Sequence, residues 1–437
     1  MLRFVIAISV LCFSVLAMEG RSGSMVVADS VTHSPLPHAS IFDRDGNVIG
    51  VCDSRGCIPY VSEDSYPIAI RYLGFKEGVV WSPDTDTIFL RESFSELPEI
   101  VVESRRHKIM HILAYLREYS TLTTYSDTVF LFREKMVDYM LPTDKNIRFK
   151  GWSKPRILKT KSYYRFTNGQ GIDSVSDESN YHFSWSDWVG IAPSAKLPAK
   201  LLDNECASDT LRGKYSSAEI WTKKDGSVNV DVNVLADTAS RKWVPNLSGF
   251  FRNRLDFENF RVRYRYCDVV ADTISPTDLA GYSFNIESNG RGHDMFQFNR
   301  VDQRFFVSTY AEVYVVDKEY ITVGEARKWH KRKFDEDKIE IYEPIEAPEL
   351  QPSIQELVER VNGVDKEKVR LGVAPDHRLV NRNVVKRNFG HRVLQLMKTA
   401  TGISRVRAKK SWNRQWNEFT KERNEQDRKR KSSAREE

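Results

Sequence analysis

The sequence of 437 residues is poor in cysteine and lacks the short motifs of several common enzyme classes. Its five cysteines form no CxxC pair of the kind that zinc sites usually contain. None of the nine histidines is followed three residues later by Glu, and the sequence has neither a Gly-x-Ser-x-Gly elbow nor a phosphate-binding P-loop. We therefore expect no cofactor. Asp and Glu are plentiful, so a pair of catalytic carboxylates, as in glycosidases, stays open.

Long apolar runs are also scarce, and the one near the start has the layout of an export leader. Met1–Ala17 carries one Arg and then an apolar core from Phe4 to Leu16. This core is shorter than the about 20 apolar residues that a spanning helix needs, and no later stretch reaches that length. We predict that residues 1–17 are a cleaved signal peptide. The mature protein is then expected in the periplasm or associated with the outer membrane, without a transmembrane helix.

Removal of the leader leaves four cysteines, an even number in an oxidising compartment. Cys52 and Cys57 flank the turn-forming tetrapeptide 53–56, which brings two strand ends opposite each other. That geometry is within reach of a disulfide. The alternative is a pair of ordinary small buried thiols. The sequence thus nominates a disulfide between Cys52 and Cys57 and leaves the alternative open.

Positive charge is concentrated at the end of the chain. Residues 401–437 contain twelve Lys or Arg and six Asp or Glu, which accounts for the whole net charge of +6. Such an end is typically solvated, and binding to a polyanion is the alternative. The candidate anion contacts are Lys429, Arg430 and Lys431. A predicted helix before them has three aromatic residues on one face, suited to a membrane surface or to packing on the protein body: Trp412, Trp416 and Phe419.

The composition of the chain, with 41% hydrophobic residues, is that of a globular protein. Residues 25–102 contain short alternating strands separated by turns. Asp45-Gly46 lies between two apolar strands and is a hairpin signal, because Gly supplies the positive φ that such turns require. Each short strand has one apolar face to bury. The region therefore predicts a small β-sandwich.

This region resembles the carboxypeptidase-regulatory-like domain, a transthyretin-like sandwich common in envelope proteins of the Bacteroidetes. The resemblance covers about a sixth of the chain and rests on PLPHASIFDRDGNVIGV at 35–51, DSRG at 53–56, IRYLGFKE at 70–77 and SFSELPEIVV at 93–102. The sequence departs from the family at His38, where Gly is usual, and at Cys52 and Cys57, where Thr and an aromatic residue are more common. The resemblance implies a non-catalytic module and assigns no active-site residue.

Apolar spacing over residues 103–120 predicts an amphipathic linking helix. His107 and His111 lie one turn apart on it, but the HxxxH spacing lacks the Glu of HExxH, so ordinary helix histidines are favoured over a metal pair. In residues 121–323 apolar and polar residues alternate again with a period of two. This pattern predicts a β-rich domain whose sheet has one buried and one solvent-exposed face. In this domain three alternating basic residues suggest an anion-binding stripe, with solvation and strand-edge protection as the more common use: Arg261, Arg263 and Arg265.

Residues 324–437 are expected to form a helical, basic C-terminal region that contains a linker. The proline-rich stretch EPIEAPELQP at 343–352 is the linker. Ser353 begins a capping box that opens a helix ending at Val361. An aromatic stretch, YHFSWSDW at 181–188, suits either ligand binding or core packing, and packing is the more common use.

The predicted fold is mainly β, with an N-terminal transthyretin-like β-sandwich, a second larger β-rich domain and a helical basic C-terminal region. The predicted function is that of a non-enzymatic, exported cell-envelope protein that binds or docks to an envelope protein or an anionic surface such as lipid head groups or glycan. No nucleic-acid partner is expected, and the oligomeric state is left open. The alternatives are a hydrolase of glycan or peptide with its site in 121–323, and a small outer-membrane barrel.

Overall fold

The computed structural model describes most of the chain between residues 25 and 364. The described residues are 25–93, 108–124, 128–143, 147–167, 171, 173–177, 185–192, 194–202, 206–211, 219–234, 255–269, 272–291, 304–332, 334 and 338–364. The chain divides into two compact units, Met1–Asn381 and Arg382–Glu437, and all described residues belong to the first.

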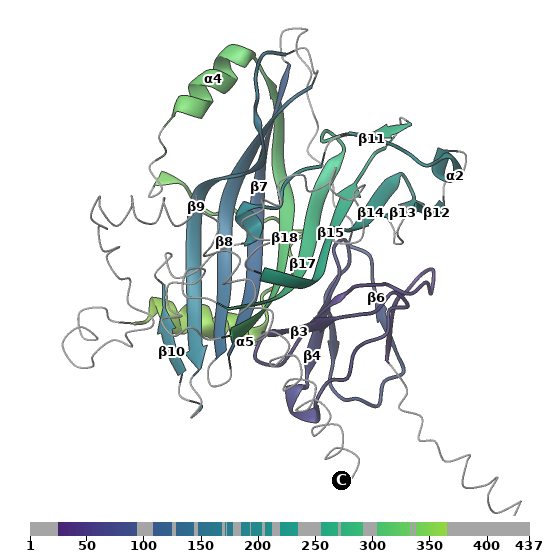
Figure 1. Ribbon diagram of the computed structural model, residues 1–437, viewed down its shortest axis with the longest axis vertical. Helices are drawn as coiled ribbons and strands as arrows, with labels where there is room; N and C mark the ends of the chain where they lie inside the picture. The colour runs from purple at the N-terminus through teal and green to yellow at the C-terminus, as the bar shows by residue number, and fades with distance from the viewer. Residues whose placement is uncertain are drawn as a thin grey trace, which may run out of the picture. The chain divides into compact units, whose positions relative to one another are not determined.

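Residues 25–93 form an N-terminal module of short strands, drawn in purple in Figure 1. The strands are β1 Val26–Asp29, β2 Ser40–Phe42, β3 Val48–Val51, β4 Ile68–Arg71, β5 Gly78–Val80 and β6 Thr87–Leu90, and a short 3-10 helix, η1, covers Glu63–Ser65. Strands β3-β2-β4-β5 form one sheet, and β1 pairs with β6 in parallel. Both sheets contribute apolar side chains to one core, among them Val27, Ile41 and Leu90.

The hairpin turn predicted at Asp45-Gly46 is confirmed, and a second Asp-Gly turn joins β13 Glu219–Lys224 to β14 Ser227–Asn233. Gly46 has φ of 78°, and its N–H donates to the carbonyl of Asp43 at 3.0 Å. Asp225 and Gly226 both have positive φ, 49° and 76°, between two paired strands. Positive φ at both central residues is the geometry of a tight two-residue hairpin turn, which explains the Asp-Gly signal.

Most of the remaining described chain forms one ten-stranded antiparallel sheet, in the order β10-β9-β8-β7-β18-β17-β15-β14-β13-β12 (Figure 1). Its strands are β7 Ile109–Thr123, β8 Thr128–Pro142, β9 Trp152–Thr167, β10 Asp173–Ser176, β12 Cys206–Leu211, β13 Glu219–Lys224, β14 Ser227–Asn233, β15 Leu255–Tyr266, β17 Leu279–Arg291 and β18 Arg304–Ile321. Short elements accompany it: η2 Trp185–Asp187, β11 Ala195–Lys196, which pairs with β16 Thr273–Ile274, and α2 Ala199–Leu202. A mainly β fold is thus confirmed.

The expected linking helix at 103–120 is wrong over its described part, because Ile109–Thr123 is strand β7. This strand lies between β8 and β18 and is buried on both faces. A strand buried on both faces has apolar residues in succession rather than in alternation, so its pattern also satisfies helical spacing. The large sheet therefore begins before residue 121, and His111 lies on a strand. His107 lies outside the described residues.

The two faces of the sheet bury different parts of the chain. On β7, even-numbered residues such as Ile112 and Leu116 join a core that also contains Trp185. Odd-numbered residues face three further clusters, of which Tyr119 joins one shared with Phe42 of the module. Period-two alternation therefore assigns one face to the core around Trp185 and the other to the module and the C-terminal elements. The predicted core role of the 181–188 stretch is confirmed for Trp185, which is buried.

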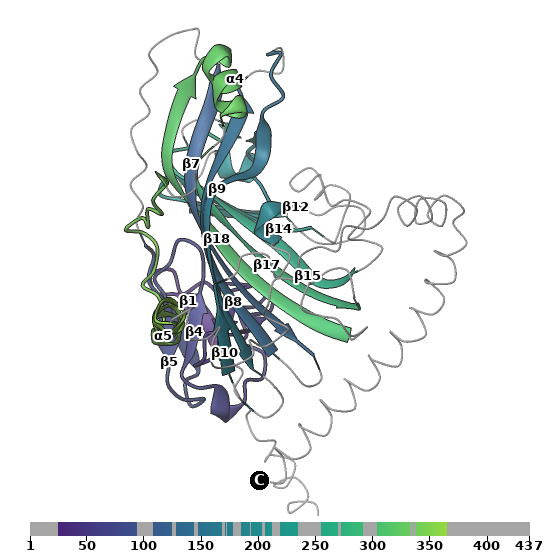
Figure 2. The same ribbon diagram turned by 90° about the vertical axis from the view of Figure 1, so that its left-hand side faces the viewer.

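Two helices, α4 Val323–Lys331 and α5 Pro352–Asn362, follow the large sheet, and both pack on it (Figure 2). The predicted capping box at Ser353 is wrong: α5 has Gln351 as N-cap without a side-chain cap, and Pro352 occupies the first turn. Pro is favoured in the first turn because N–H groups there have no acceptor within the helix, so the N–H that Pro lacks costs no hydrogen bond. The linker is also bound to the sheet, since Arg117 of β7 donates to the Pro348 carbonyl.

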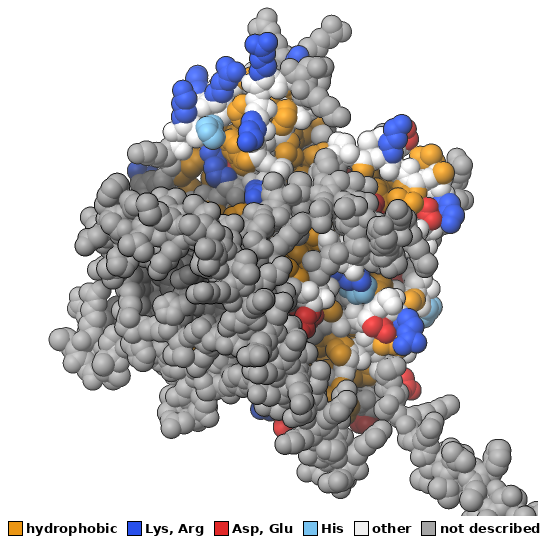
Figure 3. Space-filling model, in the orientation of Figure 1, with side chains coloured by type: hydrophobic (Ala, Val, Ile, Leu, Met, Phe, Trp, Pro, Cys, Tyr) orange, Lys and Arg blue, Asp and Glu red, His pale blue; other side chains and the backbone are white. Residues whose placement is uncertain are grey.

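Helix α4 begins with a capping box in which the Thr322 hydroxyl accepts from the N–H of Glu325 at 3.2 Å. Its last turn is basic, with Lys328, His330 and Lys331, and Figure 3 shows Lys and Arg side chains gathered over α4. None of the helices within the described residues is long and apolar enough to cross a membrane.

Candidate functional site

The three basic residues of β15 lie on the face of the sheet that the module covers. Val262 and Tyr264 alternate with them and point into the opposite core, so Arg261, Arg263 and Arg265 share the module's side. Strand β15 is interior, between β14 and β17. The interpretation of a wet face that protects a strand edge is therefore wrong. Arg265 is buried and donates to the Ser93 carbonyl at 3.1 Å, so it anchors the end of the module.

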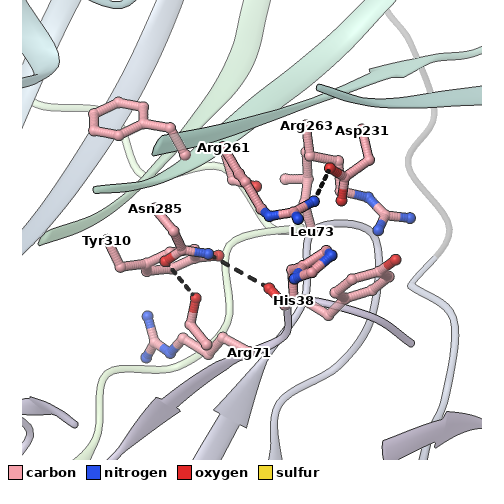
Figure 4. A pocket seen from close by; sticks show the side chains of 12 residues that line it. His38, Arg71, Leu73, Asp231, Arg261, Arg263, Asn285 and Tyr310 are labelled. Carbon is pink, nitrogen blue, oxygen red and sulfur yellow. Dashed lines mark hydrogen bonds and ion pairs between the residues drawn. The ribbon is translucent and has the colours of Figure 1, made fainter. Parts of the chain in front are cut away.

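A cavity lies between the module and this face of the sheet (Figure 4). The cavity is small, with a volume of about 20 Å³, which is room for about one or two water molecules, and it opens partly to solvent. Its polar lining comes from both sides: His38, Ser40 and Arg71 from the module, and Asp231, Arg261, Arg263 and Asn285 from the sheet. Of the predicted stripe, the cavity brings together Arg261 and Arg263, whereas Arg265 lines a neighbouring pocket.

Hydrogen bonds hold the module in place around the cavity. The Ser40 hydroxyl donates to Asn285 Oδ1 at 2.8 Å, and Asn285 Nδ2 donates to the His38 carbonyl at 3.4 Å (Figure 4). Arg71 is 2% exposed and reaches the sheet, where its Nη1 donates to the Tyr119 hydroxyl at 2.5 Å and to Glu312 at 3.3 Å. A buried ion pair of this kind positions its two elements strictly, because separating the charges leaves each of them desolvated.

The lining is richer in hydrogen-bond donors than in acceptors. Three arginines line the cavity against one carboxylate, that of Asp231. Asp231 pairs with Arg261 at 3.4 Å, and Arg71 pairs with Glu312. Arg263 has no ion pair among the described residues, and instead its guanidinium lies 3.6 Å from the centre of the Tyr72 ring. The side of the cavity next to β15 therefore carries an excess of positive charge.

Buried nitrogens of this cavity lack partners within the described part of the chain. They are Nε of Arg263, Nη2 of Arg71 and Nε2 of His38. Burial, helped by the charge of Arg265, lowers the pKa of Arg263 to about 9. Burial also raises the pKa of Asp231 to about 6, although Arg261 opposes the shift. These shifts have one physical origin, since a charge held away from water is stable only beside a charge of opposite sign.

His38 also lines the cavity and was not among the site residues predicted from the sequence. Its φ of 62° lies in the left-handed region that Gly occupies without strain, which agrees with its noted departure from a usual Gly. Its Nδ1 lies 3.2 Å from the Cys52 carbonyl. Burial and the nearby charge of Arg261 lower the pKa of His38 to about 3, so the ring is neutral at physiological pH. A strained non-glycine residue at a cavity is a recognised mark of a functional position.

Cys52 carries a free thiol, so it forms no disulfide with Cys57 in this structure. The thiol is 1% exposed, and burial together with the charge of Asp53 raises its pKa to about 12. Cys57, on the other side of the turn, is half-buried. The structure thus agrees with the alternative of a small buried thiol at Cys52.

Two further polar clusters lie in the large sheet, and the central side chain of each, His111 or Ser186, is buried. His111 Nδ1 lies 2.7 Å from Glu319, and its Nε2 lies 3.2 Å from Asp138 and 2.7 Å from Trp329 Nε1. The described residues place no hydroxyl or thiol nucleophile in hydrogen-bond contact with this ring. They also contain no cluster of potential metal ligands.

The second cluster contains a Ser-Lys pair. Lys135 Nζ donates to the Ser186 hydroxyl at 2.9 Å, and that hydroxyl donates to Glu118 at 2.8 Å. Ser186 is 0% exposed, so it offers a substrate no access. The cluster fixes the 185–187 segment on the sheet. The remaining predicted contacts, Lys429, Arg430, Lys431, Trp412, Trp416 and Phe419, lie outside the described residues.

No family model and no curated protein matches the sequence. Among solved structures, the chain is similar to one titled "Lipid-protein interactions in lipovitellin", with 7% sequence identity and a TM-score of 0.23. The match covers 51% of this chain and 26% of that chain, so this chain spans about a quarter of the other's length. A likeness at this level carries no inference about function.

Proposed function

We propose that this protein is a non-enzymatic, exported binding protein of the cell envelope, and that the cavity between the module and the sheet holds an acidic group of its ligand. The observation that carries the proposal is the excess of arginine over carboxylate in the cavity lining, where Arg263 Nε is buried without an acceptor among the described residues. A buried donor left unpaired costs about 1–3 kcal/mol. An oxyanion supplies both the acceptors and the charge, and such charge-assisted bonds are the strong ones.

The other parts of the proposal rest on the sequence and on the form of the module. The leader at Met1–Ala17 supports export to the periplasm or the outer membrane. Two small sheets around one core support a transthyretin-like sandwich of the carboxypeptidase-regulatory-like kind. The enclosure of His111 and Ser186 favours binding over catalysis, because a reacting side chain has to meet its substrate.

Anion titration of the purified full chain tests the proposal. Thermal unfolding is followed in phosphate, sulfate and acetate, each compared with sodium chloride at equal ionic strength, and affinities are measured by calorimetry. At least one oxyanion should raise the melting temperature above the chloride reference, as a ligand of the native state does. Arg263→Gln should weaken its affinity about tenfold or more, the value of a charge-assisted bond.

Arg55→Gln is the matched control, because the Arg55 side chain is 82% exposed and lies away from the cavity lining. It should bind as the wild type does. Equal weakening in Arg55→Gln and Arg263→Gln would reduce the effect to net charge. Binding of no oxyanion, or unchanged binding in Arg263→Gln, would refute the assignment of the site. Fractionation with protease shaving tests the export part separately, and an uncut cytosolic product would contradict it.

A further inference from the structure

One nitrogen of His111 makes two contacts that exclude each other. Trp329 Nε1 lies 2.7 Å from His111 Nε2, and an indole N–H only donates hydrogen bonds, so this contact requires a lone pair on Nε2. Asp138 Oδ2 lies 3.2 Å from the same nitrogen, and an ionised carboxylate only accepts, so this contact requires a hydrogen there. A proton on Nε2 therefore decides which of the two residues His111 binds.

The other nitrogen of the ring keeps one partner in both states. His111 Nδ1 lies 2.7 Å from Glu319 Oε1 and donates to it. The neutral ring thus binds Glu319 and Trp329, whereas the protonated ring binds Glu319 and Asp138. Because Trp329 lies on α4 and Asp138 on β8, protonation exchanges a bond to a helix for a bond within the sheet.

Charged groups from the neighbouring strands act on the ring in opposite senses. The carboxylates are those of Asp138 on β8 and Glu319 on β18, and Arg156 of β9 offsets part of this charge, since its Nε donates to Asp138 Oδ1 at 2.8 Å. Burial by itself lowers the pKa of His111, but the hydrogen bonds to Asp138 and Glu319 outweigh burial and raise that pKa above its ordinary value. Protonation of the ring therefore begins above about pH 6.5 as the pH falls.

Trp329 is a main point of attachment of α4 to the sheet. Its ring meets that of His111 edge-on, with centroids 5.2 Å apart, and its carbonyl accepts from Arg156 Nη1 at 3.0 Å. The guanidinium of Arg332, just after the helix, lies 5.0 Å from the centre of the Trp329 ring and adds a charge that disfavours protonation. The buried Ala326 packs in the same cluster. Loss of the indole bond therefore loosens α4 without detaching it.

We infer that His111 is a pH-sensitive attachment point for α4: the neutral ring accepts from the Trp329 indole and holds the helix on the sheet, and the protonated ring donates to Asp138 and loosens it. Acidification then weakens the attachment of α4, while the ion pairs of the protonated ring hold β7, β8 and β18 together. A half-buried donor that loses its acceptor should raise the opening constant of α4 about fivefold to tenfold.

Hydrogen–deuterium exchange of the full chain measures the opening of α4. Exchange in residues 322–332 is followed by mass spectrometry between pH 6 and pH 9, and each rate is divided by the intrinsic rate at that pH. Protection should fall about fivefold or more from pH 9 to pH 6, with a midpoint at the pKa of His111. Helix α5 is the internal reference, and its protection should stay constant.

Two histidine variants assign this change. In His111→Gln the side-chain amide oxygen accepts from Trp329 at every pH, so the dependence on pH should disappear. His330→Gln is the matched control, because it removes another histidine of α4, whose ring lies 5.4 Å from that of Trp152, and it should retain the dependence. Urea unfolding verifies that both variants are folded.

Trp329→Phe tests the same bond while His111 stays in place. Phenylalanine keeps an aromatic ring against the imidazole and lacks the N–H. Because the indole bond favours the neutral ring, its loss should raise the pKa of His111 by about 0.5–1. The measurement is an NMR titration of ring-labelled histidine, in which the signal absent from His111→Gln is that of His111.

Three results would refute the inference. The first is protection of α4 that does not change with pH in the wild type, or that changes equally in His111→Gln. The second is a change that disappears in His330→Gln, which would assign it to the other histidine. The third is a pKa of His111 that stays the same or falls in Trp329→Phe, because the indole would then not bind the neutral ring.

Discussion

Arg71→Met is the sharpest test of how the module is held on the sheet. Arg71 and Glu312 are 2% and 1% exposed, and their closest charged atoms lie 3.3 Å apart. Arg71 also lies 4.7 Å from the centre of the Tyr119 ring. Methionine fills much of the volume but leaves the Glu312 carboxylate buried without this cation. Breaking a buried pair from one side costs about 3–5 kcal/mol, a large fraction of the stability of an ordinary domain.

Urea unfolding followed by tryptophan fluorescence measures this cost. Arg71→Met should lower the free energy of unfolding by about 3–5 kcal/mol. Adding Glu312→Gln to it should restore about 1 kcal/mol or more relative to the sum of the single changes, because the two side chains are coupled. Arg55→Met is the control. Its ion pair with Asp53 is exposed, so its effect should stay within about 0.5 kcal/mol.

Two results would refute this reasoning. Additive effects of Arg71→Met and Glu312→Gln would mean that the pair carries no coupling across the junction. A loss below about 1 kcal/mol in Arg71→Met would mean that water or another group replaces the cation. Either result would also undermine the cavity, because Arg71 forms part of its wall.

Two further predictions concern turns and pH. In urea unfolding, Gly46→Ala should destabilise the protein by about 1–3 kcal/mol more than Gly226→Ala. Both glycines have positive φ, but a Cβ at Gly46 would lie 2.6 Å from Ile354 Cδ1, whereas a Cβ at Gly226 would have no neighbour within 4 Å. Equal losses of stability would contradict the packing of α5 on the module. Burial alone lowers the pKa of His111, but hydrogen bonds to Asp138 and Glu319 outweigh it and raise that pKa above its ordinary value. The stability advantage of the wild type over His111→Gln should therefore be complete below about pH 6.5 and decline as the pH rises through the raised pKa, and an advantage that grows with pH would reverse the assignment.

Features that depend on neighbouring residues were predictable from the sequence. The turns at Asp45-Gly46 and Asp225-Gly226 require positive φ, and Gly adopts positive φ whatever the packing of the flanking strands. Period-two alternation placed Arg261, Arg263 and Arg265 on one face of a strand, because successive side chains of a strand point to opposite sides. A helix ending at Val361 was also predicted and is present as α5, although the capping box at Ser353 on which that prediction rested is wrong.

Features that depend on what packs against a segment were decided only in the tertiary structure. Residues 109–123 form a strand because β8 and β18 pair with them and both of their faces are buried, which removes the alternation that marks a strand in sequence. The arginine stripe is enclosed because the module lies over it, and no local pattern carries that information. His38 stands out in the sequence only as a histidine at a glycine position. Arg71, Arg261 and Arg263 line the same cavity as His38, although they are distant from it in the chain and are brought there by the fold.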